Sequence, residues 1–213
     1  MRRILCLHGS GSSGEILKRQ IANICSHLPA TYTFDFIDAP IECDPAPDLR
    51  NFYPGPYFQF FDQYSDTAMQ EAIKIVEEVV DEDGPYDGVV GFSQGAAVAA
   101  AYIARQQLHG FFEDAPFKMA VFLCTALIPP DIATGSNMAD IMGTLGQVDI
   151  PTLHIIGRKD LCKAQSLELV KLCKRDSAQV LLNDGGHDIP RDVESTRTIA
   201  LAMERAMHVA LSG

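Results

Sequence analysis

The sequence of 213 residues predicts an α/β protein with a mostly parallel central sheet and helices on both faces. Short apolar runs alternate with longer segments of helical period, and this alternation is typical of a parallel sheet covered by helices. The length suits one substantial core, so we expect a single domain over residues 1–213. The candidate strands are RILCL (3–7), TFDFID (33–38), DGVVGF (87–92), MAVFLC (119–124), TLHIIG (152–157) and QVLLN (179–183).

Helical periodicity occupies the segments between these runs. Ser12 and Glu15 have the spacing of a capping box before a helix that ends at Pro29, and Thr67 and Gln70 have the same spacing before a second helix. An alanine-rich helix is expected to follow Ser93. The buried faces of these helices are predicted from apolar residues spaced three or four apart. They are Ile16, Ile21, Ile24 and Leu28 in the first helix; Ile73, Val76, Val79 and Val80 in the second; Leu167, Val170 and Leu172 in a helix after the fifth strand; and the apolar residues of a last helix over 193–211.

Two stretches, residues 39–64 and 129–150, fit no regular element. Loops of this length in a compact domain are usually functional covers or disordered segments. The first contains NFYPGPYFQFF (51–61), which carries six aromatic residues. This run either packs a long loop or forms an apolar wall for an acyl chain, and for the second reading Tyr53 and Phe58 are the candidate substrate contacts.

Charge and composition limit the partners and the compartment. A formal net charge of −11 disfavours nucleic acid and anionic membranes, since both attract basic surfaces. The apolar run that follows Arg2 and Arg3 is too short for a signal peptide, and no run is long enough to span a membrane. The six cysteines form no C-x-x-C pair, which suits free thiols in a reducing compartment, so we expect a cytoplasmic protein.

The motif G-x-S-x-G occurs as GFSQG (91–95), where the third candidate strand turns into the alanine-rich helix. That context is typical of a nucleophile elbow, in which a sharp turn exposes a serine hydroxyl and small neighbours avoid clashes. Ser93 is therefore the candidate nucleophile.

A serine nucleophile needs a histidine base and a carboxylate that orients it. Asp160 follows the fifth candidate strand and His187 follows the sixth, so both should meet Ser93 at the carboxyl edge of the sheet. Asp184 and Asp188 flank the histidine and are the rival acids.

The glycines of LHGSGSSG (7–14) allow two interpretations. They could present backbone N–H groups to an acyl oxyanion. The two expected donors are then Ser10 N–H and Gln94 N–H, with Gly11 N–H as the alternative to that of Ser10. They could instead bind a dinucleotide pyrophosphate, with Asp35 or Asp38 on the ribose, but this leaves GFSQG, Asp160 and His187 unexplained.

The remaining histidines have structural interpretations. His8 is expected to stiffen the loop after the first strand, and His154 lies inside a strand and should be a packed core residue. No His or Cys spacing suits zinc, so we expect no metal ion and no cofactor.

Several motifs together resemble the fungal serine hydrolases of the FSH family, which is related to the ovarian-cancer-associated candidate hydrolase. They are ILCLHGSGSSG (4–14), DAP (38–40), GFSQGAA (91–97), GRKD (157–160) with Ser166-Leu167, and GGHDIP (185–190), and they cover nearly the whole chain. The resemblance implies an α/β-hydrolase fold, esterase or thioesterase activity, and a triad of Ser93, Asp160 and His187. Several fungal members resemble stand-alone thioesterases that release acyl chains from polyketide synthase carrier domains.

The sequence therefore predicts a serine hydrolase that cleaves a small-molecule acyl ester or thioester through an acyl-enzyme. An acyl-carrier domain is a candidate partner and would need a basic patch such as Arg2, Arg3, Lys18 and Arg19. GFSQG with LHG also resembles acyl-protein thioesterases and related carboxylesterases, although those continue GFSQGG and here Ala96 follows Gly95. A binding module that has lost catalysis is a third alternative.

Overall fold

The computed structural model describes residues 1–212 except 48, 64, 110–114 and 127–146. Its centre is a six-stranded sheet in the order β2-β1-β5-β6-β7-β8, in which every neighbouring pair is parallel. The strands are β1 (Arg2–Leu7), β2 (Tyr32–Ile37), β5 (Gly88–Phe92), β6 (Met119–Leu123), β7 (Thr152–Gly157) and β8 (Ala178–Asn183). The predicted parallel sheet is thereby confirmed, and each predicted strand matches an observed one to within one residue at either end.

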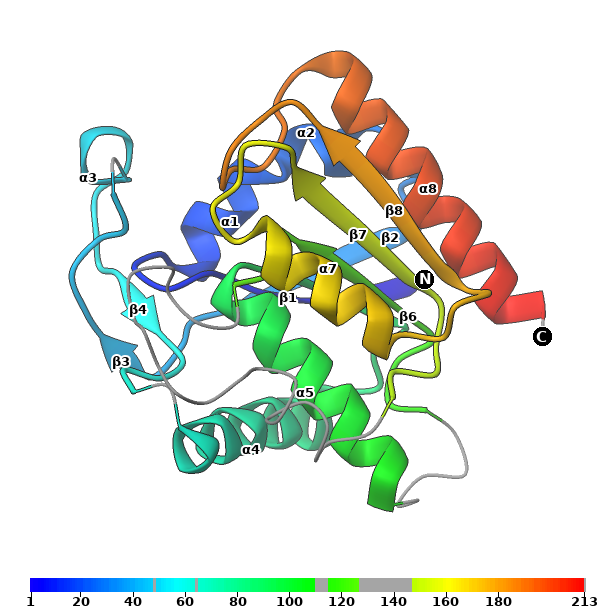
Figure 1. Cartoon of the computed structure of the whole chain (residues 1–213), viewed down its shortest axis with the longest axis horizontal. Coiled ribbons are helices and arrows are strands. Elements are labelled where there is room, and N and C mark those ends of the chain that lie inside the picture. The colour runs from blue at the N-terminus through cyan, green and yellow to red at the C-terminus, as the bar shows by residue number, and fades with distance from the viewer. Residues whose placement is uncertain (48, 64, 110–114, 127–146, 213) are drawn as a thin grey trace.

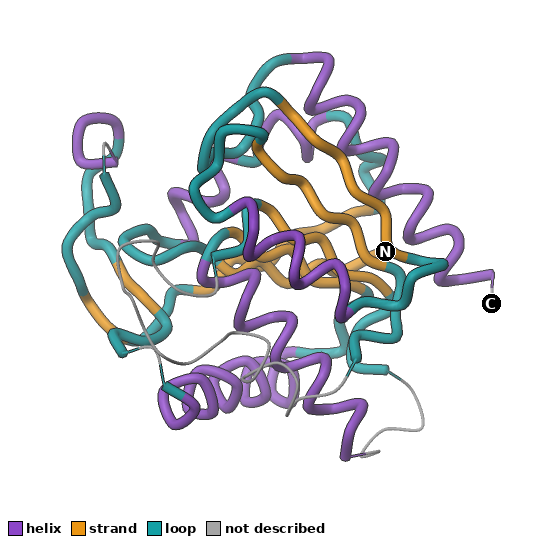
Figure 2. The backbone as a smooth tube through the Cα atoms, viewed as in Figure 1, coloured by secondary structure: helices purple, strands orange, loops and turns teal. Residues whose placement is uncertain are grey.

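Helices cover both faces of this sheet (Figures 1 and 2). Apolar residues of α4 (Asp66–Asp83), α5 (Gln94–His109) and α7 (Lys163–Leu172) share one buried cluster with Leu5, Val89 and Phe122. Those of α1 (Gly14–Gln20), α2 (Ala22–Ser26) and α8 (Val193–Ser212) share the other with Ile4 and Val121. Successive strand residues point to opposite faces and both faces are buried, which explains why the strands are nearly continuous apolar runs.

Both predicted capping boxes are wrong. The N-cap of α1 is Ser13, whose hydroxyl accepts the N–H of Ile16, and not Ser12. The backbone of Ser12 instead forms an isolated β-bridge with Phe58, so the helix begins one residue later than predicted. The N-cap of α4 is Ser65, which accepts the N–H of Ala68, and not Thr67.

The predicted helix over 16–28 is interrupted. It divides into α1 and α2 at Ile21, whose backbone has φ −95° and ψ 3°. The buried faces of both pieces remain as expected, because Ile16, Ile21 and Ile24 are all buried.

The stretch 39–64 contains regular structure, contrary to prediction. It holds β3 (Ile41–Glu42), α3 (Leu49–Phe52) and β4 (Phe58–Gln59), and the two strands pair antiparallel. We call residues 41–61 the arm, which extends from the body of the molecule at the left of Figure 1. Most of the second predicted loop, 129–150, lies outside the described residues.

No helix in the described part of the chain is both long and apolar enough to cross a membrane.

Candidate active site

Ser93 lies in the turn between β5 and α5, and its backbone is in the left-handed region with φ 54°. This conformation is costly for a residue with a Cβ and is typical of an exposed, strained nucleophile. The turn needs Gly95, because a Cβ added there would lie 2.4 Å from the carbonyl oxygen of Leu7.

The three sequence-predicted side chains meet at the carboxyl edge of the sheet. Asp160 follows β7 and His187 follows β8, as expected from the chain order. His187 Nε2 lies 2.8 Å from Ser93 Oγ, and His187 Nδ1 lies 3.0 Å from Asp160 Oδ1. The rival Asp184 instead forms an ion pair with Arg158 at 3.1 Å.

The surroundings of Asp160 determine which nitrogen of His187 carries the proton. The Asp160 side chain is fully buried, and its Oδ1 also accepts the backbone N–H of Cys162 at 2.7 Å. A carboxylate at this position accepts the Nδ1–H of a neutral imidazole, which leaves Nε2 as an acceptor for the hydroxyl proton of Ser93. This is the tautomer that a general base requires.

The electrostatics of the pair favour a charged imidazole. Burial alone would lower the pKa of His187, but the hydrogen bond and charge of Asp160, together with Cys162, raise it from 6.5 to about 9. Burial alone would raise the pKa of Asp160, yet the hydrogen bonds from His187 and Cys162 hold it below its usual value. Asp160 therefore stabilises the imidazolium that forms when His187 takes a proton.

Cys124, just past β6, is a neighbour of this pair that was not among the candidate site residues predicted from the sequence. Its Sγ lies 3.5 Å from the carbonyl oxygen of Asp188, and its backbone also has a positive φ of 45°. Burial, and then the charge of Asp160, raise the pKa of this thiol to about 12, so the thiol is neutral. The rule that placed Asp160 and His187, namely position after a strand's carboxyl end, also applies to Cys124 and could have found it.

Among the described residues, one group has the residue types and spacing to hold a metal ion. The ligand atoms of Cys124, Asp160 and His187 lie within 4.8 Å of one another. Asp160 and His187 are hydrogen-bonded to each other and Cys124 is a neutral thiol, so the arrangement suits proton transfer better than metal coordination.

The loop after β1 is held rigidly, as expected for His8. Its ring is fully buried, with Nδ1 2.7 Å from the carbonyl oxygen of Gly9 and Nε2 accepting the N–H of Ala39 at 2.9 Å. Burial lowers the pKa of His8, so the ring is neutral. His154 is likewise buried, 1% exposed, with burial lowering its pKa to about 4, which confirms its packed position.

The hydrogen bonds of the loop after β1 distinguish its two candidate oxyanion donors, Ser10 and Gly11. Gly11 N–H already donates to the carbonyl oxygen of Phe58 at 3.0 Å, so it is not free to bind an oxyanion. Ser10 N–H has no acceptor among the described residues. Gln94 is the first residue of α5, where backbone N–H groups have no intrahelical acceptor.

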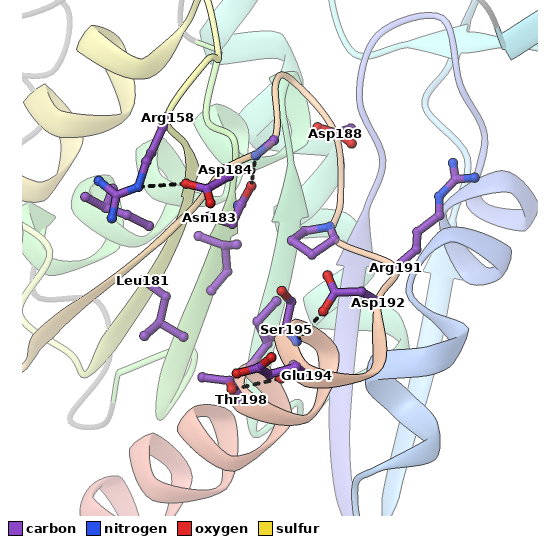
Figure 3. A pocket seen from close by; sticks show the side chains of 15 residues that line it. Arg158, Leu181, Asn183, Asp184, Asp188, Arg191, Asp192, Glu194, Ser195 and Thr198 are labelled. Carbon is purple, nitrogen blue, oxygen red and sulfur yellow. Dashed lines mark hydrogen bonds and ion pairs between the residues drawn. The ribbon is translucent and has the colours of Figure 1, made fainter.

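A cavity of about 550 Å³ lies beside the loop that carries His187 (Figure 3). It is lined by residues of β8, of the loop that follows and of the start of α8, including Leu181, Asn183, Arg191 and Ser195, but by neither Ser93 nor His187. Neither Tyr53 nor Phe58 lines this cavity either, so their predicted contact with substrate stays a prediction.

The predicted basic patch is largely paired with protein groups. Arg3 forms an ion pair with Asp35 at 2.6 Å, and Arg19 forms one with Glu15 at 2.9 Å. Arg2 donates to the hydroxyl of Tyr32 at 3.0 Å. The patch therefore offers less positive charge than the sequence alone suggests.

The fold and the arrangement of Ser93, His187 and Asp160 define a serine ester hydrolase of the α/β-hydrolase class. The family model described as "Serine hydrolase (FSH1)" matches residues 1–199, and the chain belongs to this family.

Relatives that align over nearly the whole chain are named as esterases. "Esterase FPY3" from Fusarium mangiferae is 33% identical over 220 residues, which cover 99% of this chain and 99% of that protein. "Esterase alnB" from Emericella nidulans is 27% identical and covers 97% of each chain.

Solved structures confirm the α/β-hydrolase fold. Acyl-protein thioesterase 2 from Zea mays superposes with a TM-score of 0.62 at 20% identity, covering 97% of this chain and 94% of that one. The carboxylesterase from Bacillus cereus has a TM-score of 0.59 at 17% identity and covers 96% and 88% of the two chains.

Proposed function

We propose that the protein hydrolyses acyl esters or thioesters through an acyl-enzyme at Ser93. His187 takes the hydroxyl proton, Asp160 holds the imidazole in the productive tautomer, and the N–H groups of Ser10 and Gln94 bind the oxyanion. His187 then returns the proton to the leaving group, and water cleaves the acyl-enzyme by the same route. The observation that carries this proposal is the continuous hydrogen-bonded path from Ser93 Oγ through His187 to the buried Asp160.

We further propose that the substrates are acyl or polyketide thioesters, with the acyl chain lying against Tyr53 and Phe58 of the arm. This finer assignment rests on the resemblance of the motifs to stand-alone fungal thioesterases. The acyl group could arrive on a carrier domain or on a small thiol. The names of the relatives favour a second candidate, a carboxylesterase that acts on simple esters.

The proposal also includes the setting of the enzyme. We propose one domain over residues 1–213, supported by a sheet that joins strands from both halves of the chain. We propose a cytoplasmic location, supported by six cysteines that are all free thiols.

Covalent labelling tests the nucleophile. A fluorophosphonate should label the wild-type protein on Ser93, and Ser93→Ala should abolish the label while leaving the melting temperature within a few degrees. Ser195→Ala is a matched control, because Ser195 is a partly exposed serine at the start of α8 and should not affect labelling. A folded wild-type protein that takes no label would favour a binding module.

Substrate class is tested by comparing matched acyl thioesters and oxygen esters of increasing chain length, with kcat/KM as the measure. A preference for thioesters that rises with acyl length supports the thioesterase proposal. A preference for short oxygen esters would favour the carboxylesterase.

A further inference from the structure

We propose that the side chain of Gln94, together with residues 58–61 of the arm, positions the two oxyanion donors; this inference rests on the proposed function. Gln94 is thus assigned two roles, a backbone donor to the oxyanion and a side-chain clamp on the arm. We call this set of contacts the brace.

The first half of the brace is a buried amide clamp. The Gln94 side chain accepts the N–H of Phe60 through Oε1 at 2.8 Å and donates through Nε2 to the carbonyl oxygen of Phe61 at 2.9 Å. Gln94 is 2% exposed, and the arm residues it holds are 2% and 3% exposed. The arm presents a donor and an acceptor on adjacent residues, and the primary amide satisfies both at once because it carries an acceptor oxygen and a donor nitrogen.

The second half of the brace joins the arm to the loop that carries Ser10. Phe58 exchanges backbone hydrogen bonds with this loop: its carbonyl accepts Gly11 N–H at 3.0 Å, and its N–H donates to the carbonyl of Ser12 at 2.6 Å. The Ser10 hydroxyl donates to Gln59 Oε1 at 3.1 Å. The rings of His8 and Phe60 add a contact with centroids 5.4 Å apart.

These contacts give the brace its function. Ser10 lies in the loop after β1 and Gln94 at the start of α5, two elements that also approach each other closely at Gly9 and Gly95. The arm residues 58–61 contact both elements at once, so they fix one donor relative to the other. An oxyanion hole stabilises the transition state only when its donors are already oriented before the reaction, because reorientation during the reaction would cost energy.

Gln94→Met is the direct test, because methionine keeps the length and volume of the side chain but can form neither hydrogen bond. We expect kcat to fall about tenfold to a hundredfold with KM within about twofold, since the loss falls on the transition state. The pH at which kcat/KM is half-maximal should not move, because Asp160 and His187 are untouched. A purely structural loss would instead lower the active fraction, which active-site titration with the fluorophosphonate measures separately.

Gln106→Met is the matched control. Gln106 is a buried glutamine on the same helix, 4% exposed, and its amide donates to Glu77 at 3.1 Å, far from the arm. This variant should lower the melting temperature and leave kcat per active site unchanged. Equal losses of kcat in the two variants would overturn the inference.

A second variant covers the case in which Gln94→Met does not fold. Gln59→Ala removes a partly exposed side chain and with it the acceptor of the Ser10 hydroxyl. We expect kcat to fall about fivefold, whereas Arg50→Ala, which breaks only the exposed arm pair with Asp44, should leave it unchanged. Wild-type kcat in Gln59→Ala would overturn the part of the inference that concerns Ser10.

A trifluoromethyl ketone substrate analogue supplies a readout specific to the oxyanion. Its hemiketal oxygen occupies the oxyanion site, so its Ki should rise in proportion to the fall in kcat/KM of Gln94→Met. An unchanged Ki would overturn the inference while the wild-type enzyme still hydrolyses esters. If the wild-type enzyme hydrolyses no ester and takes no label, it is the proposed function that fails.

Discussion

Replacing Asp160 by asparagine should remove the charge of the triad acid and keep the tautomer of His187. The N–H of Cys162 donates to the Oδ1 position at 2.7 Å, so the amide oxygen must occupy that position. There it still accepts the Nδ1–H of His187. The NH₂ group then replaces Oδ2, which accepts no hydrogen bond from the described residues.

The size of the loss follows from the electrostatics of the pair. A pKa raised from 6.5 to about 9 corresponds to about 3 kcal/mol of preferential stabilisation of the imidazolium. The imidazole is 34% exposed, and solvent screening reduces this to about 2 kcal/mol, or about 30-fold in rate. Asp160→Ala removes the acceptor as well as the charge and should cost about a thousandfold or more.

The pH dependence of kcat/KM separates the loss of the charge of Asp160 from the loss of its hydrogen-bond acceptor. His187 must be neutral to act as a base, so wild-type kcat/KM should rise with pH up to about 9. Without the carboxylate the pKa of His187 falls, because burial lowers it, so the deficit of Asp160→Asn should be complete above pH 9 and shrink as the pH falls below 9. The deficit of Asp160→Ala should persist at every pH. Equal deficits in the two variants, or a deficit of Asp160→Asn that does not change with pH, would refute this reasoning.

Three further predictions concern the elbow, the loop after β1 and metal ions. Ser93→Gly should melt about 2–4 °C above Ser93→Ala, because glycine relieves a φ of 54° while both variants lose the hydroxyl; a lower melting temperature would contradict the strain. Gly11→Ala should cost about 2 kcal/mol or more in urea unfolding, because φ is 69° and the new Cβ would lie 2.2 Å from the backbone nitrogen of Ala46. A chelator should leave kcat unchanged, since in the proposed mechanism His187 activates Ser93 without a metal ion; loss of activity restored by zinc would show that the cluster of Cys124, Asp160 and His187 holds an ion.

The sheet and the meeting of the three side chains could be predicted because both depend on local signals. Buried parallel strands are continuous apolar runs bounded by turns, so their ends could be read to within one residue. The carboxyl ends of such strands share one edge, which brings Asp160 and His187 to Ser93 although they lie far apart in sequence. Neither inference needs knowledge of any particular tertiary contact.

The arm could not be predicted for the opposite reason. β3 and β4 are only two residues long. Phe58 pairs with Ser12, and Phe60 is held by Gln94; in each case the partner lies more than thirty residues away in sequence. The same contacts explain the error at the start of α1, because Ser12 pairs with Phe58 and leaves the capping position to Ser13. A spacing rule such as the capping box considers only residues close in sequence, so it cannot predict that Ser12 pairs with a distant residue instead of capping the helix.

The pairing of the basic residues bears on how a carrier-bound substrate would be recognised. A net charge of −11 repels an acidic carrier domain in general, and a local basic patch would have to overcome that repulsion. Arg3 and Arg19 are already paired with Asp35 and Glu15, so docking at this patch would require those ion pairs to be exchanged for intermolecular ones. Exposed pairs of this kind are worth little whether intramolecular or intermolecular, so the exchange yields little net attraction. For the proposed carrier-bound thioesters, docking at this patch should therefore contribute little to the discrimination between substrates.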